Sequence, residues 1–189
     1  MTYVRETIVT TKNSDNTIKM SPLGVYIDGD SFSIKPFKPS LSLENILRNK
    51  SGVINYIDDV RIFASCITKR NIKVDFVETS KINCSRIKNA VSHTEFIVEE
   101  IIEDKLRPTL FCRPVNEEIH KMYYGFNRAK SAVLELCILA SRLGIIEDKK
   151  IQDEIKYLKI AIDKTAGEHE LEAWSWLLNY IKNYKDSIK

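Results

Sequence analysis

Residues 17–46 read TIKMSPLGVYIDGDSFSIKPFKPSLSLENI, and this stretch decides the fold. Its first half holds short runs of β-branched and apolar residues, which are typical of strands. The turn formers at 28–30 separate two of these runs, residues 23–27 and 32–35. Leucine and isoleucine then recur at helical spacing. We therefore expect an antiparallel meander that leads into a short helix at 42–49.

The flanking segments extend this pattern. Residues 6–11 form another strand-like run, and the four turn formers at 13–16 predict a hairpin between that run and residues 17–20. Residues 53–57 read as a buried strand, and Asp58 or Asp59 can cap a second short helix that ends near Thr68. Two longer runs, residues 95–102 and 110–115, predict a further hairpin.

The hydrophobic period changes from two to 3.6 residues after Gly125. A long helix is expected from there to Gly144, a second amphipathic helix around 151–162, and a third after a capping box at Thr165–Glu168. The predicted fold class is therefore α+β. It consists of an antiparallel β-rich domain over residues 1–120 and a C-terminal unit of three helices over residues 121–189.

Composition narrows the function classes. The chain has 189 residues, of which 43% are hydrophobic and 29% charged, and its net charge is +3. This composition is typical of a globular protein, and so small a charge does not indicate a nucleic-acid partner. Since the apolar runs are short and the N-terminus lacks a signal-peptide core, we expect no membrane span and a cytoplasmic location.

The sequence shows no protein-based catalytic centre or metal site. Its four cysteines are widely spaced and share no ligand pattern with histidines, which argues against a zinc site and a disulfide framework. The three histidines, at positions 93, 120 and 169, lie in polar segments and belong to no metalloprotease or nucleophile-elbow motif. We expect them to be surface histidines and leave the catalytic residues unassigned.

The most suggestive segment is the entry to the first helix. Two lysines and two serines precede or open this helix at positions 35–42, where free backbone N–H groups and the helix dipole favour a phosphate group. Alternatively, Ser42 only caps its helix and the lysines are solvated. Pro22 and Gly24 in a strand fit either the close approach of a flat ring or a bulge.

Taken in order, these elements resemble the FMN-binding split barrels. The resemblance rests on four features: the meander, the Ser-Pro-Leu-Gly element at 21–24, the basic segment that opens the helix, and Val-Ile-Asn at 53–55. The sequence is most similar to the family called domain of unknown function 447. That family has a Pro-(Met/Leu)-Gly-Val element, a Gly-Phe-Asn-Arg-Ala-Lys helix start and a Thr-Ala-Gly-Glu cap, found here at 22–25, 125–130 and 165–168.

The resemblance implies an FMN-binding homodimer in which each flavin lies near the subunit interface. It assigns the phosphate to Lys38, Ser40 and Ser42, with Asn45 nearby. Asn55 would close the pocket, and the isoalloxazine ring would lie along the backbone of Met20, Ser21, Pro22, Leu23 and Gly24.

One position departs from the family pattern of flavin reductases. Those proteins usually carry Arg or Lys and then Thr where this chain has Leu41 and Ser42. The missing charge could come from Asn127 and Arg128 at a helix start, although Arg128 could equally pair with an acidic residue of its own unit.

The expected function follows from this resemblance. It is that of an FMN-binding flavoprotein, an oxidoreductase that transfers hydride or electrons to a small substrate which the sequence does not identify. A non-catalytic FMN-binding or carrier protein is the alternative. A plain dimeric interaction module and a deazaflavin protein remain open as well.

Overall fold

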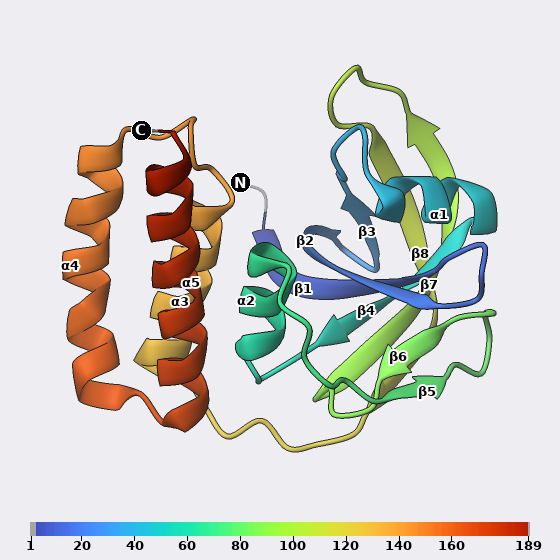
Figure 1. Cartoon of the computed structure of the whole chain (residues 1–189). Coiled ribbons are helices and arrows are strands. Elements are labelled where there is room, and N and C mark those ends of the chain that lie inside the picture. Colours follow the sequence, from blue (N-terminus) through green and yellow to red (C-terminus); the bar gives the residue numbers. More distant parts are fainter. Residues whose placement is uncertain (1–2, 189) are drawn as a thin grey trace. The chain divides into compact units, whose positions relative to one another are not determined.

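The computed structural model describes residues 3–188 (Figure 1). Six antiparallel strands close a barrel in the order β1-β2-β3-β8-β7-β4. Their bounds are β1 Tyr3–Lys12, β2 Ile18–Asp28, β3 Ser31–Ile34, β4 Ser51–Tyr56, β7 Ser92–Ile102 and β8 Thr109–Ile119. The helices are α1 Leu41–Asn49, α2 Arg61–Thr68, α3 Arg128–Ala140, α4 Asp148–Thr165 and α5 Glu168–Ser187, and β5 Phe76–Glu78 pairs with β6 Ser85–Ile87.

The predicted α+β class and the antiparallel barrel are thus confirmed. The meander over residues 6–35 is present, but residues 17–20 and 23–27, read as separate runs, form the single strand β2. Pro22 does not interrupt this strand, because β3 pairs only with Val25–Asp28. Around Pro22 the strand is bonded to β1 alone, so the missing proline N–H breaks no ladder on the other side.

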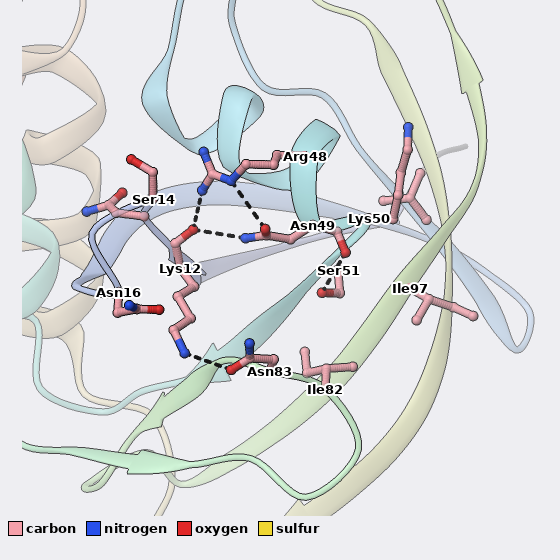
Figure 2. Close-up of a pocket in the computed structure, with 12 residues that line it drawn as sticks. Lys12, Ser14, Asn16, Arg48, Asn49, Lys50, Ser51, Ile82, Asn83 and Ile97 are labelled. Atoms are coloured by element: carbon pink, nitrogen blue, oxygen red, sulfur yellow. Dashed lines mark hydrogen bonds between the residues drawn. The ribbon is translucent and has the colours of Figure 1, made fainter.

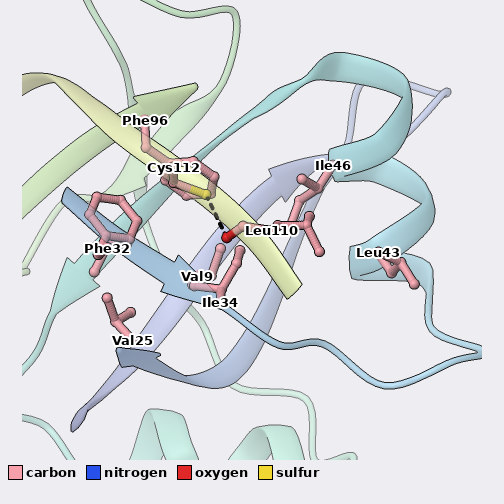
Figure 3. Packing of buried hydrophobic residues seen from close by; sticks show 10 residues of the cluster. Val9, Val25, Phe32, Ile34, Leu43, Ile46, Phe96, Leu110 and Cys112 are labelled. Atoms are coloured by element: carbon pink, nitrogen blue, oxygen red, sulfur yellow. Dashed lines mark hydrogen bonds between the residues drawn. The ribbon is translucent and has the colours of Figure 1, made fainter. Parts of the chain in front are cut away.

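The barrel core contains an apolar cluster to which α1 contributes Leu43 and Ile46 (Figure 3). Phe32 and Phe96 meet edge to face inside the barrel with their ring centroids 5.7 Å apart. Leu43 and Ile46 of α1 belong to this cluster, and both are buried. The first turn of α1 is therefore held against the barrel by its own apolar face.

The segment between β4 and β7 carries a short ribbon, β5 and β6, that the sequence did not predict. It is fixed by Glu95, a fully buried carboxylate on β7. This side chain accepts backbone hydrogen bonds from Ser80 (3.1 Å), Lys81 (2.8 Å) and Ile82 (3.0 Å), and a further bond from Asn116 Nδ2 (2.9 Å). Four such hydrogen bonds offset the free-energy cost of removing this carboxylate from water.

The C-terminal helices form as expected, with two corrections at their ends. The predicted helix from Gly125 is α3, which begins only at Arg128, so that Phe126 lies outside the apolar stripe and is exposed. The predicted capping box at Thr165–Glu168 is shifted: Gly167 is the N-cap of α5, and its N–H donates to the Glu170 carboxylate at 2.9 Å. Thr165 instead ends α4.

The chain divides into two compact units, residues 1–58 with 74–123 and residues 59–73 with 124–189. The division into domains 1–120 and 121–189 stays a prediction, and the structure differs from it in residues 59–73. These residues carry α2, which contacts α5 and α3 and so belongs with the helices. No helix described between residues 3 and 188 is long and apolar enough to cross a membrane.

Candidate functional site

The first element of the candidate site is the uncovered half of β2. Met20, Ser21, Pro22, Leu23 and Gly24 are all paired with β1, whereas the β3 ladder begins only at the next residue. These five residues are partly exposed. They therefore offer a length of strand edge to which an external group can come close.

The second element is the N-terminus of α1, which packs beside that strand. Ser40 is the N-cap, and its hydroxyl accepts a hydrogen bond from the N–H of Leu43 at 3.3 Å. The side chain of Ser42 lies within hydrogen-bonding distance of the Ser21 hydroxyl on β2. Ser42 is therefore not the helix cap, and the contact joins the two sequence motifs predicted to share a ligand. The remaining first-turn N–H groups have no partner within the helix.

Positive charge reaches this end of α1 from two elements. The Lys38 ammonium pairs with Glu103 at 2.5 Å, and its side chain is one third exposed. Arg107, from the β7–β8 connection, lies over the ring of Phe37 at 4.3 Å and donates to the carbonyl of Lys35 at 2.9 and 3.1 Å. Sequence reasoning missed Arg107, because only the pairing of β3 with β8 brings it to the loop.

The side-chain amides of Asn45 and Asn55 are engaged within the protein. Asn45 is fully buried; it donates to Thr11 Oγ1 and Asn13 Oδ1 and accepts from Arg48. Asn55 is equally buried. It donates to the Ile8 carbonyl and Thr10 Oγ1 and accepts from the N–H of Ile87. The structure thus gives both residues a positioning role, and direct contact with a ligand stays a prediction.

Asn127 and Arg128 lie in the helical unit. Asn127 is the N-cap of α3: its Oδ1 accepts from the N–H groups of Ala129 and Lys130, and its Nδ2 donates to the carbonyl of Thr165. Arg128 is exposed. The contribution of this pair to a phosphate site on the barrel therefore stays a prediction.

A hollow of about 730 Å³ lies at the other end of α1, away from the candidate site (Figure 2). Its lining includes the cations Lys12, Arg48 and Lys50 and no carboxylate. Arg48 Nη2 and Asn49 Nδ2 both donate to the Lys12 carbonyl, at 2.7 and 2.9 Å, which ties the end of α1 to β1. Arg48 and Lys50 thus lie at the C-terminal end of α1, where a positive charge interacts favourably with the negative end of the helix dipole.

The donor set at the N-terminus of α1 fits a phosphate ester. It combines a serine hydroxyl, first-turn amides and a lysine, all of which favour a dianion. The adjoining strand edge can accept a flat heteroaromatic ring through its backbone. In the described part of the chain, the residues of this site include no nucleophile–base pair.

Comparison with known proteins identifies the family. The N-terminal domain model of the proteins of unknown function DUF447 matches residues 5–121, and the C-terminal model of the same family matches residues 127–179. No curated protein sequence matches the chain. Among solved structures, an FMN-bound protein from Methanosarcina mazei, itself assigned to DUF447, is 20% identical over 94% of both chains, with a TM-score of 0.80.

Two further structures extend the likeness to the barrel. Nitrilotriacetate monooxygenase component B from Bacillus cereus is 15% identical, with a TM-score of 0.53, over 68% of this chain and 77% of its own. A flavoredoxin from Methanosarcina acetivorans is 13% identical, with a TM-score of 0.54, over 65% and 72%. The barrel thus has the fold of the split-barrel flavoproteins, and the chain belongs to the DUF447 family.

Proposed function

We propose that the chain binds FMN non-covalently at the α1 end of the barrel and acts as an oxidoreductase. The observation that carries the proposal is the contact between Ser42 and Ser21, because it sets a phosphate-binding helix start directly beside the uncovered edge of β2. The FMN-bound DUF447 relative from Methanosarcina mazei supports this assignment.

Each residue has a defined task. Ser42 and the first-turn amides would bind the phosphate, while Ser40 keeps the helix start in place. Lys38 would exchange its partner Glu103 for the phosphate, a favourable exchange because the Glu103 side chain is 70% exposed and regains water. The backbone of Met20–Gly24 would lie along the isoalloxazine ring. Bound FMN supplies hydride or electron transfer, and these residues bind and orient it.

We further propose that the protein is a cytoplasmic homodimer. Phe37, Leu41 and Leu106, all close to the predicted phosphate loop, have 59%, 46% and 68% of their surface exposed. The backbone bond from Lys38 N–H to the Leu106 carbonyl, 2.8 Å, keeps the two exposed segments together. An apolar patch of this kind at a site edge fits burial against a second copy, which would also cover the flavin.

The test is a calorimetric titration with FMN, together with the absorption spectrum of the purified protein between 300 and 550 nm. Loss of one charge-assisted bond costs about 1.5–3 kcal/mol, so Lys38→Ala and Ser42→Ala should each weaken FMN roughly 10- to 150-fold. Glu103→Gln is the matched control: it removes the competing carboxylate and should leave affinity equal or higher. Unchanged affinity in both Lys38→Ala and Ser42→Ala would refute the phosphate assignment.

A second measurement separates the oxidoreductase from a carrier. Under anaerobic conditions, NADH or NADPH should bleach the flavin band of the FMN-loaded protein much faster than that of free FMN. A flavin that stays bound and is bleached no faster than free FMN would favour the non-catalytic carrier.

A further inference from the structure

Two histidines and a glutamate gather on paired strands away from α1. His93 on β7 stands opposite Glu118 on β8, and His120 follows β8 with its N–H bonded to the carbonyl of Val91 at 2.8 Å. One ligand atom from each of the three lies within 4.8 Å of the others. The expectation of surface histidines is wrong for His93, which is 2% exposed.

The two imidazoles share one hydrogen bond. His93 Nδ1 and His120 Nε2 are 2.8 Å apart, with ring planes inclined by 15° and centroids separated by 5.0 Å. Two lone pairs cannot face each other at this distance, so a single proton lies between the nitrogens. A metal ion accepts the same two lone pairs.

The space required for an ion is small. Two Zn–N bonds of about 2.0–2.1 Å in tetrahedral geometry separate their nitrogens by roughly 3.3–3.4 Å. The two nitrogens would therefore have to separate by about half an ångström, and the His120 ring would also have to turn, because a tetrahedral ion lies to one side of the line that joins them. This histidine is half-buried and lies just beyond the last residue of β8, so the movement disturbs no strand ladder.

The far side of His93 faces a buried carboxylate. Within residues 3–188, its Nε2 is buried and has no hydrogen-bond partner. It faces Oε1 of the buried Glu95 at 3.5 Å, which is too long for a hydrogen bond but close enough for electrostatic attraction. A proton on Nε2 is favoured by this carboxylate, and it leaves the lone pair of Nδ1 free for a cation.

We propose that His93, His120 and Glu118 bind one divalent transition-metal ion of the zinc class. Two imidazoles and one carboxylate form a ligand set that Zn²⁺ accepts, with water in the fourth position. Ca²⁺ and Mg²⁺ prefer oxygen ligands and fit poorly. Glu95 is a positioning residue. This inference does not depend on FMN binding, because none of these residues belongs to the proposed flavin site.

The charges around the cluster allow a cation. Glu118 is exposed and accepts a hydrogen bond from Asn116 at 2.8 Å, so its second oxygen stays available. Arg86 places a positive charge near His120, which opposes the binding of a cation. Its guanidinium is held by the carbonyls of Ile87 and Lys88, at 3.3 and 3.2 Å.

The test is a titration of the EDTA-treated full chain with Co²⁺, followed by d–d absorption between 500 and 650 nm, and with Zn²⁺ by calorimetry. We expect one ion per chain and an intense visible band from a four-coordinate site. His120→Ala should weaken binding at least 100-fold. His169→Ala, which changes an exposed histidine of α5, is the control and should bind as wild type.

His93→Ala is avoided because its side chain is buried and its loss threatens folding. The thermal unfolding temperature of His120→Ala should equal that of wild type. A loss of metal binding in this variant then reflects the missing ligand and not a loss of fold. The proposal is overturned if wild type takes up no stoichiometric ion, or if His120→Ala binds as tightly as wild type.

Discussion

Replacement of Glu95 by glutamine measures how firmly the β5–β6 segment is fixed to the barrel. Oε2 accepts the N–H groups of Lys81 and Ile82 at 2.8 and 3.0 Å, and Oε1 accepts those of Ser80 and the Asn116 side chain at 3.1 and 2.9 Å. Glutamine keeps the shape but puts an NH₂ group, a donor, in place of one of these oxygens. Oε1 also accepts the Ser80 hydroxyl at 3.2 Å, so the less costly orientation puts the NH₂ in place of Oε2, where two donors lose their acceptor.

The cost follows from these bonds. A hydrogen bond to a charged group contributes about 1.5–3 kcal/mol, so two lost bonds predict a decrease of about 3–6 kcal/mol in the free energy of unfolding. Urea denaturation followed by circular dichroism gives this quantity. Glu99→Gln is the matched control, since Glu99 and its partner Arg113 are both 52% exposed and such a pair contributes about 0–1 kcal/mol. Equal stability of the two variants would refute the reasoning.

Two further predictions concern the barrel core and its thiols. Gly52→Ala should destabilise the chain by about 1–3 kcal/mol in the same assay, because a Cβ there would lie 2.8 Å from the Phe96 ring. Burial raises the pKa of the Cys112 thiol to about 12, so this group is almost entirely protonated at pH 8. A thiol reagent at pH 8 should therefore modify the partly exposed Cys66 first and Cys112 only after unfolding; equal rates in the native protein would contradict this order.

Where local pattern and final packing agree, the fold could be read from the sequence. The short helix expected at 42–49 is α1, and the two runs at 95–102 and 110–115 belong to β7 and β8. The β5–β6 ribbon could not be read in this way, because its strands have three residues each and show no alternation. It is held largely by long-range bonds such as those to Glu95, and these leave no periodic signal.

The candidate site likewise contains residues that local sequence predicts and contacts that it does not predict. Ser40 and Ser42 were predicted from their place at a helix start, which is local information. The pairing of Lys38 with Glu103 and the approach of Arg107 to the same loop join residues about 65 to 72 positions apart, and only strand register determines them. His93 was misjudged for a similar reason. Its neighbours in sequence are polar, and its burial comes from residues elsewhere in the chain.

Pro22 connects the fold to the proposed function. A proline in the middle of a fully paired strand would remove a ladder bond, so its presence in β2 requires one side of the strand to be free there. The structure meets this requirement with a β3 ladder that stops at Val25 and a helix start that lies beside the open edge at Ser21. A closed barrel has no need of an uncovered strand segment for stability. The proposed function would give this segment a role, since a flat ring carrying a phosphate ester would match both the edge and the helix start.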